Sequence, residues 1–173
     1  MVALPDGPMS YVCRQCGEAH EGLPDLVLDE PSYAHEIPPE ERAQRVRLDD
    51  DLCVVDGEHY FVRGVIEIPV HGQADAFGIG AWVTQKKENF QTYVDNFNSP
   101  EIGPFFGWLS NEFSFKGQST LHLKTMAHFR GAGRRPVIQL EATDHPLAVA
   151  QRDGMDLDEA WAVVHERLGP AAT

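Results

Sequence analysis

Residues 53–70 have the sequence CVVDGEHYFVRGVIEIPV. Asp56-Gly57 favours the tight turn of a β-hairpin, and it separates two apolar runs. In the second run, over residues 60–68, every second side chain from position 60 onward belongs to one apolar face. This period of two predicts a half-buried strand. The strand should end or lie at a sheet edge at Pro69, because proline has no amide hydrogen to donate.

Three more strands are predicted beyond this hairpin. Residues 77–83 and 136–142 are short apolar runs, and residues 120–129 alternate between apolar and polar side chains. Tyr11-Val12 can enter a further short strand. The aromatic run PFFGWL at residues 104–109 is expected to plug the core or a cleft, because each aromatic side chain buries a large area.

Helices are predicted before, within and after this sheet region. A short helix over residues 37–45 has proline and acidic residues in its first turn. A second helix follows Thr84, its expected N-cap, and has an apolar face formed by Phe90, Tyr93, Val94 and Phe97. Two helices end the sequence. One begins at His145-Pro146, and the other begins with Asp156 and Glu159 in the spacing of a capping box.

These elements together predict an α+β fold. We expect a mainly antiparallel sheet of about five strands, two to four helices packed on it, and an N-terminal Cys-x-x-Cys knuckle. At 173 residues the chain has the size of one domain, and no repeat or linker divides it. The expected single domain, 1–173, contains a loop-rich knuckle segment (1–30), a sheet region with one inserted helix (47–142) and C-terminal helices (145–168).

The composition narrows the classes of function. The net charge of −13 disfavours nucleic-acid binding, because a domain that binds a duplex presents a basic face to the phosphates. No apolar run approaches the ~20 residues of a membrane span, and the first residues lack the pattern of a signal peptide. We therefore expect a cytoplasmic protein that does not bind a membrane. The acidic charge suits solubility or a basic protein partner.

The segment CRQCGEAH, from Cys13 to His20, is the clearest chemical signal. Cys-x-x-Cys-Gly allows a tight turn to direct two thiolates toward one ion. A structural zinc site needs four ligands, and no second Cys-x-x-Cys pair is present. The predicted set is therefore Cys13, Cys16, Cys53 and His20, with His59 as a substitute ligand.

Two other interpretations of the cysteine pair stay open. The thiols can be reduced and metal-free, with only a packing role. They can also form a redox pair, but Gly17, Gly22 and Pro24 oppose the helix that normally follows a redox motif and lowers the thiol pKa.

Several stretches, taken together, resemble a bacterial family known as domain of unknown function 2199 (DUF2199). The stretches are YVC at 11–13 with Cys16-Gly17 and His20, DLCVVDGEHYFVRG at 51–64, IEIPV at 66–70, FFGWL at 105–109, and Arg135-Pro136 through DHPLA at 144–148. The resemblance covers residues 10–168 and implies a compact bacterial cytoplasmic protein. It implies no activity and no catalytic residues. One departure is the basic stretch at 84–88, where the family usually has a serine and an acid.

Three functions are consistent with the sequence. The first is a non-enzymatic domain with a structural zinc knuckle. The second is an acidic, immunity-like protein that neutralises a basic partner, since electrostatic complementarity accelerates association. The third is an enzyme with an aromatic-lined pocket near Trp82, Phe106 and Trp108, in which His122 or His128 acts as the base.

Overall fold

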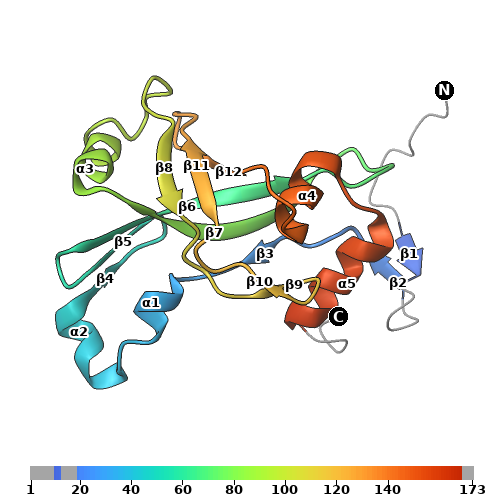
Figure 1. Ribbon diagram of the computed structural model, residues 1–173, viewed down its shortest axis with the longest axis horizontal. Coiled ribbons are helices and arrows are strands. Elements are labelled where there is room, and N and C mark those ends of the chain that lie inside the picture. Colours follow the sequence, from blue (N-terminus) through green and yellow to red (C-terminus); the bar gives the residue numbers. More distant parts are fainter. Residues whose placement is uncertain (1–9, 13–18, 169–173) are drawn as a thin grey trace.

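The structure is a computed structural model that describes residues 10–12 and 19–168. Its central feature is a curled, mostly antiparallel sheet, as Figure 1 shows. The strands of this sheet are β3 (Leu26–Val27), β4 (Val46–Leu48), β5 (Leu52–Val55), β6 (His59–Ile68), β7 (Phe77–Gln85), β8 (Phe105–Trp108), β11 (Lys124–His128) and β12 (Val137–Leu140). Two small hairpins lie outside it: β1 (Ser10–Val12) with β2 (Ala19–Glu21), and β9 (Ser114–Phe115) with β10 (Gln118–Ser119).

Helices precede, interrupt and follow the sheet. They are α1 (Ser32–His35), the 3-10 turn η1 (Pro39–Glu41), α2 (Arg42–Arg45), α3 (Lys87–Asp95), α4 (Pro146–Asp153) and α5 (Leu157–Leu168). The predicted α+β class and the antiparallel character are confirmed. Within the described residues the sheet joins eight strands rather than about five. The three additional strands are β8, which was expected to be a plug, and β3 and β4, which are only two and three residues long and leave no pattern in the sequence.

The predicted hairpin forms the middle of the sheet. Asp56 and Gly57 have φ angles of 55° and 65°, the left-handed conformation that tight hairpin turns need. Beyond the turn, β6 pairs with β5 and also along its whole length with β7, from Tyr60 opposite Gln85 to Ile68 opposite Phe77. The hairpin prediction is therefore confirmed in position.

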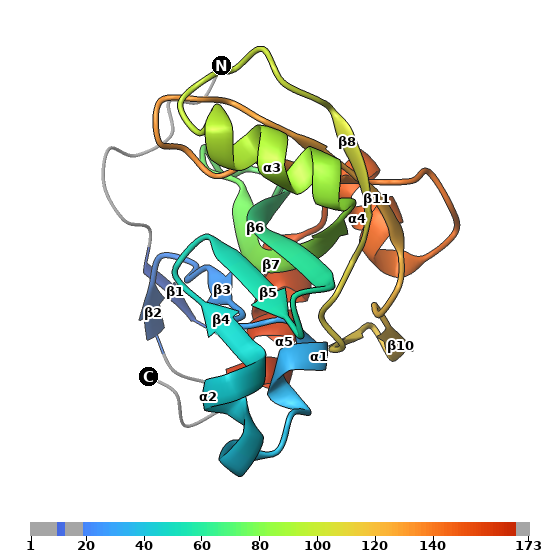
Figure 2. The ribbon, with the colours of Figure 1, turned by 90° about the vertical axis from the view of Figure 1, so that its left-hand side faces the viewer.

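Both faces of β6 are buried. Val62, Ile66 and Ile68 belong to the main core, to which α3, α4 and α5 also contribute. Phe61 points the other way, into a second cluster that contains Trp82 and Ala34 of α1. Figure 2 shows α3 on one side of β5, β6 and β7 and the segment α1–α2 on the other. The alternation predicts a strand with one buried face, whereas β6 is buried on both. The second face is covered by the α1–α2 segment, whose sequence has little periodicity.

Arg63 fixes that covering segment to the sheet. Its guanidinium is buried, donates to the carbonyl oxygens of Leu28 (3.0 Å) and Asp50 (3.1 Å), and lies 5.4 Å from the centre of the Trp82 ring. The Trp82 indole also donates to the Leu28 carbonyl oxygen, at 2.9 Å. A buried cation is tolerated here because backbone oxygens and an aromatic face replace part of its hydration.

The sheet curls until β8 meets the end of β7. Val83 and Leu109 form an isolated bridge, and the Ser110 amide donates to the Trp82 carbonyl oxygen at 2.8 Å. The buried Asn111 side chain continues this contact, since its Oδ1 accepts from the Trp82 amide at 2.7 Å. The curl places β8 beside β7 without a long ladder between them.

β12 depends on a side chain for part of its pairing. It is parallel to β6, with Val137 opposite Val65, and then diverges from that strand. Gln151 of α4 takes over, because its Oε1 accepts from the Leu140 amide and its Nε2 donates to the Ile138 carbonyl oxygen, both at 2.8 Å. A single amide side chain thus provides both hydrogen bonds that a neighbouring strand would have made.

Several helix starts differ from the predictions. Thr84 is not an N-cap: it stays in β7, opposite Phe61, and the cap position of α3 is Lys86. The predicted helix over 37–45 is divided into η1 and α2. His145 caps α4 as expected, since its Nδ1 accepts from the Leu147 amide at 3.1 Å and its Nε2 lies 2.9 Å from the Ser119 carbonyl oxygen. Its tautomer is therefore the one with the proton on Nε2.

The capping box of α5 forms only in part. The Asp156 amide donates to Glu159 Oε2 at 3.3 Å, but the Asp156 carboxylate turns to His71, whose Nδ1 lies 2.8 Å away. His71 Nε2 lies 3.0 Å from the Asp153 carbonyl oxygen. Both partners are acceptors, so the geometry favours the imidazolium, and the Asp156 contact raises the pKa of His71. The pair links the β6–β7 loop to the α4–α5 junction.

Candidate functional site

An exposed group of side chains lies on β8, β11 and β12. Side chains alternate along a strand, and this directs Phe106 and Trp108 to the outside, where they are 43% and 41% exposed. The register places Met126 beside Phe106 and Lys124 beside Trp108, and Gln139 of β12 lies beside Met126. We call these five residues the aromatic face. In Figure 1 the three strands that carry it lie next to one another, between α3 and α4.

The backbone beneath the aromatic face is closely packed. A Cβ atom at Gly107 would overlap the Thr84 carbonyl oxygen, so glycine permits β8 to approach β7. The Trp108 amide donates to Thr84 Oγ1 at 2.9 Å, and Thr125 Oγ1 donates to the Gly107 carbonyl oxygen at 2.8 Å. The exposed rings therefore stand on a fixed strand and not on a free loop.

The two rings form a right-angled pair. Their centroids are 5.2 Å apart with an interplanar angle of 85°, the edge-to-face arrangement that aromatic quadrupoles favour. Lys124 Nζ lies 6.0 Å from the centre of the Trp108 ring, at the outer limit of a cation–π contact. One ring can therefore serve as a floor and the other as a wall for a bound group.

Two hollows lie on this side of the protein. The larger, of about 330 Å³, is lined by Phe106, Met126 and Gln139 among others. The smaller, of about 170 Å³, is lined by Trp108, His122 and Thr143 among others. Lys124, Leu140 and Glu141 line both, so the two hollows are neighbours.

The polar groups around these hollows are partly without partners. His128 Nε2 lies 2.7 Å from Gln139 Oε1, which leaves the Gln139 amide nitrogen available as a donor. Among the residues that the structure describes, neither the Lys124 ammonium nor the Glu141 carboxylate forms an ion pair. The hollows thus offer a positively charged donor, Lys124, and a negatively charged acceptor, Glu141, beside the two aromatic rings.

The aromatic pocket of the enzyme hypothesis does not form as expected. Trp82 is fully buried in the second core cluster, whereas Phe106 and Trp108 are exposed. The two histidines differ as well. His122 precedes β11, has a φ angle of 65°, and lines the smaller hollow, whereas His128 is bonded to Gln139. Within the described part of the chain, neither histidine is hydrogen-bonded to a nucleophilic side chain.

The zinc ligand set is only partly visible. Cys13 and Cys16 lie outside the described residues, and His20 lies in β2, of which the structure describes the backbone. Cys53 is fully buried in the second core cluster, and this burial raises the pKa of its thiol to about 12. In Figure 1, β5 lies at the opposite end of the long axis from β1 and β2. The four-ligand set stays a prediction.

Within the described residues, neither His59 nor any group of acidic side chains adds a metal site. His59, the substitute ligand, packs against Tyr33 with ring centroids 4.8 Å apart. In the described residues, no group of three or more histidine, cysteine, aspartate or glutamate side chains is arranged to hold a metal ion. The described helices also include none with the length and apolar character that a membrane span requires. A basic protein partner rests on the net charge and stays a prediction.

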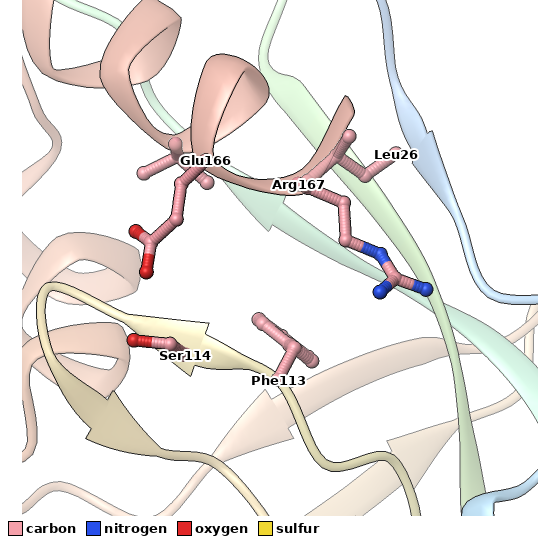
Figure 3. Close-up of a pocket in the computed structure, with 6 residues that line it drawn as sticks. Leu26, Phe113, Ser114, Glu166 and Arg167 are labelled. Atoms are coloured by element: carbon pink, nitrogen blue, oxygen red, sulfur yellow. The ribbon is translucent and has the colours of Figure 1, made fainter. Parts of the chain in front are cut away.

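A third hollow, of about 160 Å³, lies beside the end of α5. Figure 3 shows Glu166 and Arg167 extending from α5 toward the strand segment that carries Phe113 and Ser114. Small-molecule sites are usually larger, about 300 Å³ or more. We therefore regard the aromatic face as the better candidate.

The expectation that the aromatic run plugs the core or a cleft is met only in part. Phe105 packs against the main core as expected, whereas Phe106 and Trp108 do not. A usable signal was the alternation of β11, which puts Lys124 and Met126 on one face. Because β8 pairs with β11, every second residue of β8 must lie on the same side of the sheet as Lys124 and Met126.

Comparison with known proteins identifies one protein family. The family model described as "Uncharacterized protein conserved in bacteria (DUF2199)" matches residues 12–155, which include the whole aromatic face. Neither the comparison with curated proteins nor the comparison with solved structures gave a match.

Proposed function

This chain belongs to the DUF2199 family of uncharacterized bacterial proteins, and we propose that it is a non-enzymatic binding protein whose recognition surface is the aromatic face. The observation that carries the proposal is the pair of adjacent exposed rings, Phe106 and Trp108, on a closely packed strand. Burying an aromatic side chain is favourable, so exposing two together is a cost to the free protein that a bound partner recovers.

The hollows beside the rings support binding over catalysis. Ligand sites combine apolar walls with a few convergent polar groups, and the larger hollow has this composition. Catalysis by a nucleophile needs a base within hydrogen-bond reach of it. His128 is instead bonded to an amide oxygen, and in the described residues neither His128 nor His122 is hydrogen-bonded to a nucleophilic side chain.

A thermal-shift screen over chemically diverse metabolites tests the proposal. A ligand present at 100 times its Kd stabilises the folded state by about 2.7 kcal/mol, which is readily measured. The same ligand should not shift the Trp108→Ala variant. Tyr33→Ala is the matched control, because Tyr33 is an aromatic residue of similar exposure (38%) on α1. Ligands that shift both variants equally would place the site elsewhere and contradict the proposal.

A structural zinc ion at the knuckle is a second proposal, independent of the first. It is supported by the pairing of Val12 with Ala19 in the β1–β2 hairpin, because the Cys-x-x-Cys segment connects these paired ends. Elemental analysis of untagged protein should find about one zinc per chain. Cys53→Ser tests the third thiol: retention of zinc in this variant would remove Cys53 from the ligand set, and zinc-free wild-type protein would refute the site.

A further inference from the structure

The exposed aromatic surface is small. Phe106 is 43% exposed and Trp108 is 41% exposed. For aromatic side chains of ordinary size these fractions correspond to roughly 200 Å² of exposed surface in total. A stable protein partner usually covers about 800 Å² on each side. The larger hollow, of about 330 Å³, lies at the lower end of the range for small-molecule sites. The dimensions therefore fit one or two rings of a small ligand better than a protein surface.

The charges around the hollows restrict the chemistry of that ligand. Lys124 and Glu141 line both hollows, and within the described residues neither is neutralised by an ion pair. A phosphorylated ligand would meet the Glu141 carboxylate and a chain of net charge −13. A cationic ligand would meet the Lys124 ammonium. A neutral ligand with hydroxyl groups satisfies both, because a hydroxyl can donate to the carboxylate and accept from the ammonium.

The right-angled rings restrict its shape. A flat, weakly polar face can stack on one ring while its edge meets the other, and the available amide nitrogen of Gln139 lies on the same side of the sheet. A pyranose ring has this shape, with C–H groups on one face and hydroxyl groups around its edge. Its C–H groups are the weak donors that an aromatic face attracts.

From these features, and resting on the proposed binding function, we infer that the aromatic face binds a carbohydrate, with one sugar ring stacked on one of the two rings, its edge against the other, and its hydroxyl groups bonded to Lys124, Glu141 and Gln139. The smaller hollow on the Trp108 side of Lys124 provides room for a neighbouring sugar unit. An oligosaccharide should therefore bind more tightly than its monomer.

Tryptophan fluorescence gives a direct test. The chain has three tryptophans, of which Trp82 (0%) and Trp161 (4%) are buried and Trp108 is 41% exposed. Acrylamide quenching therefore reports mainly on Trp108. We would measure quenching while titrating glucose, N-acetylglucosamine, maltotriose, cellotriose and chitotriose. At least one sugar should lower the quenching constant about two-fold at saturation.

Variants locate the effect. Phe106→Ala retains the Trp108 reporter and should weaken sugar binding about ten-fold, as expected for loss of a central aromatic contact. Tyr33→Ala should leave sugar binding unchanged. Equal binding by Phe106→Ala and the wild-type protein would overturn the inference even if a sugar binds.

Non-sugar probes separate this inference from the proposed function. Adenosine and phenylalanine are titrated in the same way. If either protects Trp108 and no sugar does, the carbohydrate inference is wrong while the binding function stands. If no sugar, neither probe and no member of the metabolite library protects Trp108, the binding function fails together with the inference.

Discussion

Replacement of Gln151 by alanine should destabilise the protein through the backbone of β12. The side chain pairs with the Leu140 amide and the Ile138 carbonyl oxygen, both at 2.8 Å, where β12 has diverged from β6. Ile138 is fully buried and Leu140 nearly so. A buried backbone group left without a partner costs about 1–3 kcal/mol. Because Gln151 is half-buried and water can replace it in part, we expect a total loss of about 2–4 kcal/mol.

Urea denaturation measures this loss directly, and two variants separate its causes. Gln151→Met keeps most of the side-chain volume but provides neither the donor nor the acceptor, so it should cost nearly as much as Gln151→Ala. Arg152→Ala, at an exposed neighbouring position, should change the unfolding free energy by less than about 0.5 kcal/mol. Hydrogen exchange gives a local measurement, since the Leu140 amide should exchange at least about ten-fold faster in both Gln151 variants. A Gln151→Met variant as stable as the wild type would refute the pairing role.

Three further predictions follow from the described contacts. Gly107→Ala should lower the unfolding free energy by about 1–3 kcal/mol in urea titrations, because the new Cβ overlaps the Thr84 carbonyl oxygen and forces β8 away from β7. The pKa of His71 is raised in the folded state by the Asp156 contact, so its stabilising effect is complete below the unfolded-state value of about 6.5 and is lost as the pH rises through the folded-state value. The stability difference between wild type and His71→Gln should therefore be larger at pH 5.5 than at pH 8.5, and a difference independent of pH would contradict this assignment. The Cys53 thiol, with its pKa raised to about 12 by burial, should resist a thiol reagent at pH 8 until urea unfolds the protein; peptide mapping that finds it labelled in the native state would show the burial to be wrong.

The parts of the fold that followed from the sequence are those with strong local signals. The alternation of residues 60–68 and the Asp56-Gly57 turn determine β5, β6 and their register, because the side-chain period and the turn act on neighbouring residues. The His145 cap is local in the same way. The second core cluster could not be predicted, since α1 has only four residues and is held by distant contacts such as the bond from the Ser32 amide to the Ser110 carbonyl oxygen.

The candidate site was only half predictable. The aromatic run was visible, but whether Phe106 faces the core or the solvent depends on which strand lies beside β8. That pairing, Phe106 with Met126, joins residues twenty positions apart along the chain. Thr84 shows the same limit. Threonine is a common helix N-cap, yet the Thr84 hydroxyl accepts a hydrogen bond from the Trp108 amide. No local sequence pattern indicates this partner.

The parallel pairing of β6 with β12 has a consequence for synthesis of the protein. Val65 of β6 pairs with Val137 of β12, so the sheet cannot be completed until β12 has been synthesised. Until then, the hairpin of β6 and β7 presents residues such as Ile66, which are fully buried in the folded protein, and an unpaired edge to other nascent chains. Non-local closure of this kind also slows folding. Synthesis of β12, and not emergence of the first hairpin, should therefore set the moment at which this sheet is protected from aggregation.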